Sequence, residues 1–108
     1  MKVINEQDFE LYYQIVMKYC DEVFAYLNAK YNVSISDFQS LQNLLIDIRK
    51  WKFRINNKEF FFHGDGCSVM NGKEEICCWS FGLNENKEID VNYLNYDEYK
   101  IIKTLNFI

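Results

Sequence analysis

The spacing of hydrophobic positions separates a helical first half of the chain from a second half built of strands. In the first half, apolar side chains from Phe9 to Leu27 recur every three or four residues, which places them on one face of an α-helix. The pattern predicts one long helix over residues 6–30. Asn5 is suited to cap its first turn, and Asn32 to end it in the left-handed conformation that asparagine tolerates.

A second, shorter helix is predicted next. Ser36 stands three residues before Gln39, the spacing of a capping box at a helix N-terminus. The apolar face of this helix extends from Phe38 to Ile48. Because the connection between the two helices is short, we expect them to form an antiparallel pair.

After residue 50 the period shortens to two, the period of a β-strand. Asn56 and Asn57 predict a two-residue hairpin turn between two strands, because asparagine tolerates a positive φ. The turn fixes the register, and with it which side chains share a face. One face carries Trp51, Phe53, Ile55, Lys58, Phe60 and Phe62, and the other carries Lys52, Arg54, Glu59, Phe61 and His63, with Arg54 opposite Glu59.

A second hairpin follows. Gly64-Asp65-Gly66 breaks the strand, and both glycines are free to adopt a positive φ. Residues 67–70 form a short strand, and Asn71-Gly72 predicts the next turn. On the return strand over 75–81, Cys77, Trp79 and Phe81 face the core, whereas Ile76, Cys78 and Ser80 face away. A charged edge strand over 87–91 and a short C-terminal helix around Ile102 complete the chain.

This order of elements predicts an α+β fold. Two N-terminal helices pack on an antiparallel meander sheet of four to five strands, and a short C-terminal helix follows. The 108 residues form a single domain, and the 49% hydrophobic content supplies a core without disulfides or metal.

Charge and hydropathy narrow the classes of function. The net charge of −4 argues against generic nucleic-acid binding. Residues 59–98 hold nine acids and two lysines, a balance of −7, which favours a basic partner. The sequence has no apolar run long enough for a membrane helix, and its polar N-terminus does not resemble a secretory signal. We therefore expect a cytoplasmic protein, where its four cysteines stay reduced.

The chemistry-bearing residues gather around His63, the one histidine of the chain. A zinc site would use His63, Cys67, Cys77 and Cys78, but the two adjacent cysteines point to opposite strand faces. A nucleophilic site would pair Cys67 with His63 as its base, but no oxyanion-hole signature accompanies them. We therefore expect no cofactor, no metal and no enzyme activity. A small enzyme or zinc-binding domain centred on His63 and Cys67 stays open as the alternative.

A motif in three parts adds a resemblance. It consists of Phe62-His63-Gly64-Asp65-Gly66-Cys67, then Asn71-Gly72, then Trp79-Ser80-Phe81-Gly82. Over residues 60–94 the pattern resembles a family of small bacterial proteins with a Phe-His-Gly-x-Gly-Cys strand end, a hairpin, and a strand of Asp-Phe-Asp-Phe-Gly type. Such proteins resemble immunity proteins encoded beside polymorphic or contact-dependent toxins. This chain departs where that pattern has acids, at Cys78 and Ser80.

Charge and resemblance together predict an immunity-type inhibitor. Its partner would be a cognate toxin domain, expected to be a basic nuclease, and not nucleic acid or membrane. Whether the chain is a monomer or a homodimer stays open. A third interpretation, a subunit of a larger assembly, calls for an exposed sheet edge. The candidate partner-binding residues are Phe61, His63, Asp65, Glu74, Glu75, Glu85, Glu88 and Asp90.

Overall fold

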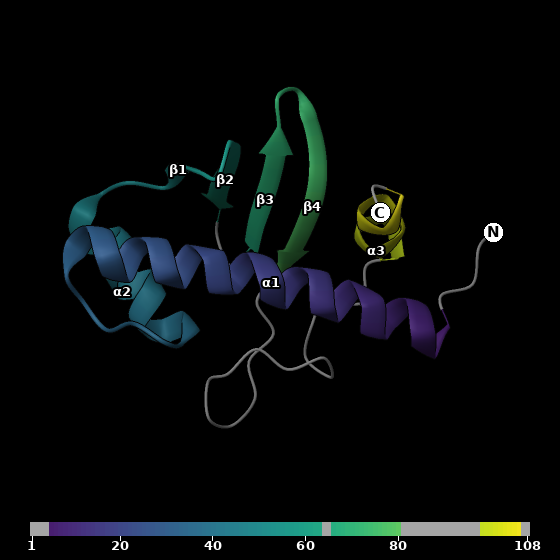
Figure 1. Cartoon of the computed structure of the whole chain (residues 1–108), viewed down its shortest axis with the longest axis horizontal. Coiled ribbons are helices and arrows are strands. Elements are labelled where there is room, and N and C mark those ends of the chain that lie inside the picture. The colour runs from purple at the N-terminus through teal and green to yellow at the C-terminus, as the bar shows by residue number, and fades with distance from the viewer. Residues whose placement is uncertain (1–4, 64–65, 81–97, 107–108) are drawn as a thin grey trace.

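The computed structural model describes residues 5–63, 66–80 and 98–106. It confirms the α+β fold, with two N-terminal helices, a four-stranded antiparallel sheet and a short C-terminal helix (Figure 1). None of the helices in these ranges is long and apolar enough to cross a membrane. The edge strand predicted over 87–91 lies outside the described residues. The elements are α1 (Glu6–Tyr31), α2 (Phe38–Ile48), β1 (Lys52–Ile55), β2 (Lys58–His63), β3 (Gly66–Asn71), β4 (Glu74–Ser80) and α3 (Glu98–Leu105).

Both ends of α1 are capped as predicted. The Asn5 side chain accepts a hydrogen bond from the Asp8 amide, and Asn32 ends the helix in the left-handed conformation. The predicted cap of α2 is wrong by one residue. Asp37 caps this helix, with its carboxylate 2.7 Å from the Ser40 amide and the Ser40 hydroxyl reaching back. Asp is at least as good an N-cap as Ser, and here it stands directly before the first helical residue.

The four strands follow one another in the order β1-β2-β3-β4, all antiparallel. The β1–β2 hairpin has the predicted register, with Phe53 opposite Phe60. Its turn residues Asn56 and Asn57 both take a positive φ, at 51° and 66°. This is the backbone of a type I′ turn, which matches the twist of the two strands.

The β3–β4 hairpin differs from its prediction. Asn71 is the last residue of β3, opposite Glu74, so the turn is Gly72-Lys73 and not Asn71-Gly72. Gly72 has a φ of 66°. In the described part of this hairpin Gly66 does not use a positive φ, but it cannot carry a side chain, because a Cβ would lie 2.8 Å from the Trp79 carbonyl oxygen.

A bulge in β4 follows from this turn. In both strands the core-facing residues have odd numbers, as Val69 and Cys77 do. The turn, however, places an odd-numbered residue of β3 opposite an even-numbered residue of β4. Without an extra residue, one strand would therefore turn its apolar face to water. The register shifts at Val69/Met70, and Ile76 is the inserted residue that restores the match.

Helix α1 lies across the sheet (Figure 1). Tyrosines seven residues apart along it contact different strands. Seven helical residues rise by about 10.5 Å, close to two strand spacings, which is the step from β4 to β2. The contacts are the Tyr12 hydroxyl with the Cys78 carbonyl of β4, Tyr19 with Phe60 of β2 at 5.8 Å between ring centroids, and Tyr26 with Phe53 of β1 at 6.2 Å.

The hydrophobic core lies between this face of the sheet and the helices. Leu41 of α2 lines a narrow internal space with Phe62 and Trp79, so α2 covers the same face as α1. Trp51 shares the core-facing side by register but is 43% exposed. The buried core residues are Tyr12, Val16, Cys20, Val23, Leu27, Ile35, Leu41, Leu45, Phe53, Ile55, Phe60, Phe62, Cys67, Val69, Cys77, Trp79 and Ile101.

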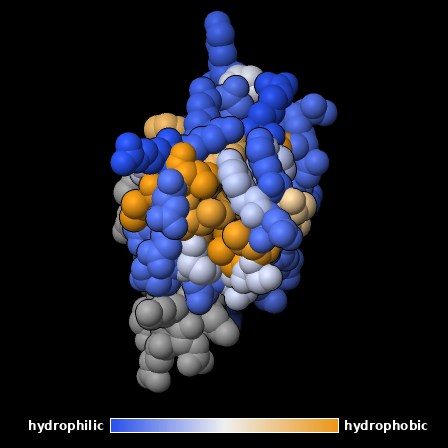
Figure 2. Space-filling view, turned by 90° about the vertical axis from the view of Figure 1, so that its left-hand side faces the viewer, coloured by the Kyte–Doolittle hydropathy of each residue, from blue (hydrophilic) through white to orange (hydrophobic). Residues whose placement is uncertain are grey.

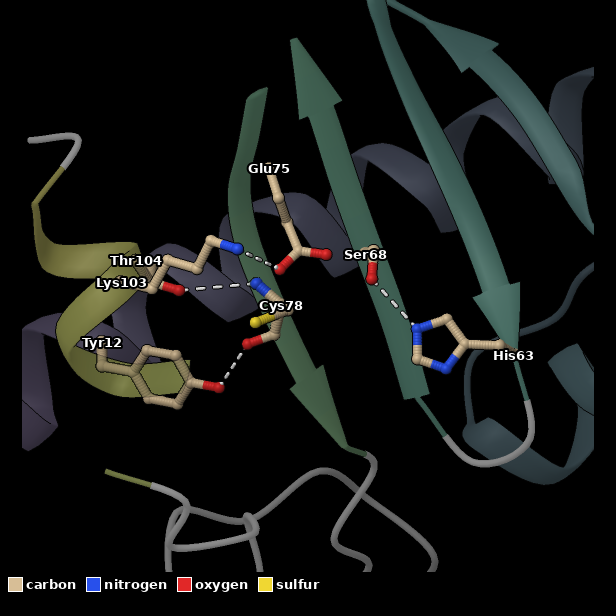
Figure 3. Close-up of polar contacts among 7 residues, drawn as sticks. All are labelled: Tyr12, His63, Ser68, Glu75, Cys78, Lys103 and Thr104. Atoms are coloured by element: carbon tan, nitrogen blue, oxygen red, sulfur yellow. Dashed lines mark hydrogen bonds and ion pairs between the residues drawn. The ribbon is translucent and has the colours of Figure 1, made fainter. Parts of the chain in front are cut away.

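Two helices close the outer edge of β4 (Figure 3). The Tyr12 hydroxyl of α1 donates to the Cys78 carbonyl at 2.7 Å, and the Cys78 amide donates to the Thr104 hydroxyl of α3 at 3.4 Å. Tyr12 and Thr104 are both almost fully buried. An edge strand exposes unpaired peptide groups with which other chains can pair. These two hydrogen bonds satisfy such groups at the centre of β4.

Replacing Tyr12 by Phe or Thr104 by Val removes the hydroxyl partner of one buried peptide group. We expect each variant to lower the free energy of unfolding by about 1–3 kcal/mol, the cost of leaving a buried polar group unmet. Urea unfolding followed by circular dichroism measures this. Tyr31→Phe is the matched control, because no described residue bonds to its hydroxyl. A similar loss in Tyr31→Phe and Tyr12→Phe would contradict the role of the edge bonds.

Candidate functional site

The face of the sheet turned away from α1 and α2 is the candidate site, and we call it the open face. Its central row joins all four strands: Lys52 lies opposite Phe61, Phe61 opposite Ser68, and Ser68 opposite Cys78. Phe61 is 44% exposed there, whereas Phe60 and Phe62 beside it are buried. The predicted division of the aromatic run between two faces is confirmed.

Phe61 is held by a neighbouring imidazole. The rings of Phe61 and His63 lie 5.6 Å apart, tilted by 35°. His63 Nε2 lies 3.0 Å from the Ser68 hydroxyl on the adjacent strand (Figure 3). Gly66, opposite His63, leaves room for the ring, because a Cβ there would lie 3.4 Å from the imidazole Cε1. The orientation of this exposed aromatic pair is therefore fixed by β3.

Ser68 also connects His63 to an ion pair. Glu75 of β4 lies 3.2 Å from the Lys103 ammonium of α3. Burial acts to raise the pKa of the Glu75 carboxyl, but hydrogen bonds from Ser68 and Lys103 outweigh it, and the pKa lies below its ordinary value. The Ser68 hydroxyl thus lies between the Glu75 carboxylate and His63 Nε2, and it is 3.0 Å from the latter.

The result is a chain of polar contacts from α3 to the exposed aromatic pair. It passes from Lys103 through Glu75 and Ser68 to His63. In the triad of serine hydrolases the imidazole stands between the acid and the serine, where it takes the serine proton. Here the serine stands between the acid and the imidazole, so the order differs from that of the triad, and the imidazole lies beside the exposed Phe61 ring.

The predicted site residues are only partly brought together. Phe61, His63 and Glu75 share the open face, and Glu74 points to the other side by strand alternation. Asp65, Glu85, Glu88 and Asp90 lie outside the described residues, so the acidic surface stays a prediction. Sequence reasoning missed Ser68 and Lys103. The register of the two hairpins places Ser68 next to Phe61, but no local signal connects Lys103 to Glu75.

Both acids described on the open face are paired with lysine. Glu59 lies 3.0 Å from the Lys52 ammonium and Glu75 is paired with Lys103. Arg54 lies directly opposite Glu59 as predicted, but the ion pair of Glu59 is with the diagonal Lys52. Any unpaired negative charge of residues 59–98 therefore comes from acids other than Glu59 and Glu75.

The alternative site at His63 and Cys67 does not assemble. Cys67 is buried in the core, whereas His63 is exposed on the open face. Burial raises the pKa of the Cys67 thiol well above its ordinary value, and raises that of Cys77 to about 12. Cys78 points away from Cys77. Across residues 5–63, 66–80 and 98–106, no three His, Cys, Asp or Glu side chains are grouped to share a metal ion.

A second exposed apolar area lies at the other end of the molecule. Figure 2 views the molecule from the side of α2 and shows apolar side chains at its centre, surrounded by polar ones. Ile46 of α2 is 57% exposed. Within the described residues, no polar group is positioned against Ile46 in the way that Ser68 is positioned against His63. We therefore take the open face as the candidate site.

Comparison with protein-family models, with curated proteins and with solved structures found no match to this chain. The geometry of the open face and the charge of the chain therefore carry the functional proposal. Both are properties of this sequence itself.

The lowered pKa of Glu75 makes stability depend on pH. Its contribution is present above the pKa of the unfolded chain and is lost as pH falls toward the lower folded value. We expect Glu75→Gln to cost about 1 kcal/mol at pH 7 and progressively less below about pH 4. Urea unfolding at both pH values measures this. Glu59→Gln is the control, because the Glu59 side chain is 38% exposed and an exposed ion pair contributes little to the free energy of unfolding. A cost independent of pH would contradict the assignment.

The buried thiols give a second prediction. All four cysteines are buried, and the thiolate is the reactive form. A disulfide-exchange reagent is therefore expected to label the native protein only as fast as it unfolds, and to label four thiols at once in urea. Mass spectrometry of digested protein identifies the site of any early labelling. Fast modification of Cys67 in native protein at neutral pH would restore the His63–Cys67 alternative.

Proposed function

We propose that this protein is an immunity-type inhibitor that binds and neutralises a cognate bacterial toxin domain, and that the open face makes the contact. The observation that carries the proposal is the exposed aromatic ring of Phe61, 44% exposed at the centre of a four-stranded sheet and stacked on His63. Large aromatic side chains are the usual anchors of protein interfaces, and most of the binding free energy comes from a few of them.

The polar chain behind Phe61 supports this use. An interface loses free energy when it must immobilise side chains on binding. Here His63 already lies 3.0 Å from the Ser68 hydroxyl and beside the Phe61 ring. The ring that would enter a pocket on the partner is thus oriented before the encounter. Glu75 and Lys103 lie at the rim of the same face, where charged pairs add to specificity more than to affinity.

Charge supports a basic partner. Residues 59–98 carry a balance of −7 in a chain whose net charge is −4. Opposite charge accelerates association and selects between partners. A nuclease binds the phosphate backbone through lysine and arginine, so its cleft offers a surface of the required sign. The motif over residues 60–94, with its likeness to immunity families, agrees with this choice. The inhibitor would act in the cytoplasm, before the toxin reaches its substrate.

The direct test is co-expression with a toxin domain, sought first in the gene that neighbours this one. We expect a stable complex on affinity purification and restored growth of cells that express the toxin. Titration of the purified inhibitor should reduce nuclease activity to zero at one equivalent. Absence of both the complex and the rescue would refute the proposed function.

The contact face is tested separately by Phe61→Ala. We expect affinity for the toxin domain to fall by about 30-fold, equivalent to about 2 kcal/mol, as for an anchor residue. Leu11→Ala is the matched control, because Leu11 of α1 is 40% exposed but lies away from the open face. Surface plasmon resonance gives both affinities, and thermal unfolding checks that both variants fold. Equal affinity of the two variants would place the contact elsewhere.

A further inference from the structure

The outer edge of β1 has a defined backbone orientation. The Phe62 amide donates to the Trp51 carbonyl at 2.8 Å, so Trp51 and Phe62 form a hydrogen-bonded pair. In an antiparallel ladder such pairs alternate with non-bonded ones. Lys52 and Arg54 are therefore the non-bonded positions, and their amide and carbonyl groups point away from β2.

The two edges of the sheet differ in whether their outward peptide groups are hydrogen-bonded. At β4 the outward groups of Cys78 are bonded to side chains of α1 and α3. At β1 no described residue hydrogen-bonds to the outward peptide groups of Lys52 or Arg54. Both side chains are exposed, and so is Trp51 directly before them. One edge is thus closed by the protein's own helices, while the other presents two amides and two carbonyls.

The open edge is the most basic segment of an acidic chain. Residues 48–58 contain five of the twelve Lys and Arg residues and no acid. Lys52 is paired with Glu59 across the sheet, and Lys50 lies over the Phe53 ring at 5.1 Å. Arg54 has no ion pair within the described residues. The five basic residues are Arg49, Lys50, Lys52, Arg54 and Lys58.

The two sides of β1 also differ in chemistry. Lys52 and Arg54 project on the open face, whereas Trp51 and Phe53 belong to the side that faces the helices. Any strand that paired with β1 would alternate its own side chains between these two environments. Acidic side chains would meet the two cations, and apolar ones would lie beside the exposed Trp51.

We propose that the β1 edge accepts an extended segment of a partner protein in which acidic and apolar residues alternate, and that this segment becomes a fifth strand. Strand addition of this kind obtains affinity from the main chain and specificity from alternate side chains. The proposal does not rest on the proposed function, because it uses the outward peptide groups and cations of the β1 edge and not the Phe61 ring.

Two other occupants fit the observations less well. A second copy of this chain pairing through β1 would bring Lys52 and Arg54 against the same cations, and like charges directly opposite one another disfavour pairing. A single-stranded nucleic acid would use the cations and stack on Trp51, but it would leave the outward peptide groups unused. An acidic extended peptide is the occupant that engages backbone, charge and apolar side chain together.

The test uses a short synthetic peptide that alternates glutamate and valine, titrated into the full chain and followed by nuclear magnetic resonance. We expect the largest amide shifts at Lys52 and Arg54, and slower hydrogen exchange of both amides in the complex. A peptide of the same composition with the glutamates grouped at one end is the control, and it should bind at least about tenfold more weakly because its side chains cannot alternate.

Arg54→Pro and Arg54→Thr separate backbone from charge. No described residue accepts a hydrogen bond from the Arg54 amide, and proline is tolerated where an edge amide faces solvent. We expect Arg54→Thr to weaken peptide binding by about fivefold through loss of one charge, and Arg54→Pro to abolish it through loss of the amide as well. Circular dichroism confirms that both variants fold.

A charge-reversed pair keeps the proposal testable if Arg54→Pro does not fold. The double variant Lys52→Glu, Arg54→Glu should reject the glutamate–valine peptide and bind a lysine–valine peptide in its place. Three results would overturn the proposal: shifts confined to residues outside β1, a dimer through β1 in sedimentation, or binding of an oligothymidylate with no binding of the peptide. Toxin rescue by the Arg54→Pro variant would leave the proposed function intact, so the two can fail separately.

Discussion

A single inserted residue in β4 determines which side chains of that strand face the core. The turn at Gly72-Lys73 joins β3 and β4 in a register that would set their apolar faces on opposite sides. Ile76 is the extra residue that corrects it, so that Cys77 and Trp79 join the core while Cys78, also buried, lies on the opposite side of the strand. The part of the open face that β4 contributes depends on this shift. Ser68 lies beside Cys78, and Glu75 lies within reach of Ser68, because the strand was moved by one position.

The open face combines a fixed aromatic ring with charges that are already paired. Phe61 and His63 are held by Ser68, and two lysines neutralise the neighbouring acids. Such a surface has little conformational entropy to lose on binding, which favours recognition of a preformed partner over folding around a flexible one. The basic β1 edge adjoins the same face through Lys52 and Arg54. In a chain that is acidic as a whole, a basic strand edge thus lies beside a face whose described acids are paired with lysine.

The sequence was sufficient where structure is decided locally. The long helix, its caps and the Asn56-Asn57 hairpin follow from spacing and turn chemistry within a few residues, and their positions were predicted well. The second turn was misplaced because its register depends on which faces of β3 and β4 meet the core, a property of the whole sheet. The cap of α2 was displaced because Ser36 and Asp37 are both good caps, and only one of them meets the first helical residue.

Distance along the chain limited the prediction of the site. Register placed Phe61 and His63 on one face, but the bonds that hold the edge of β4 join Tyr12 to Cys78 across 66 residues. Nothing in the pattern around Tyr12 distinguishes its hydroxyl from that of Tyr19 or Tyr26. Likewise, the pairing of Lys103 with Glu75 requires α3 to pack beside β4, which periodicity does not report.

The closure of the β4 edge has a consequence for the order of folding. Thr104, which caps the Cys78 amide, lies 26 residues after it in the chain. Any intermediate in which β4 has paired with β3 but α3 has not yet packed therefore leaves this amide unmet. In that state the β4 edge is available to other chains, as edge strands generally are. Packing of α3 is thus the folding step that ends the exposure of this edge to misassembly.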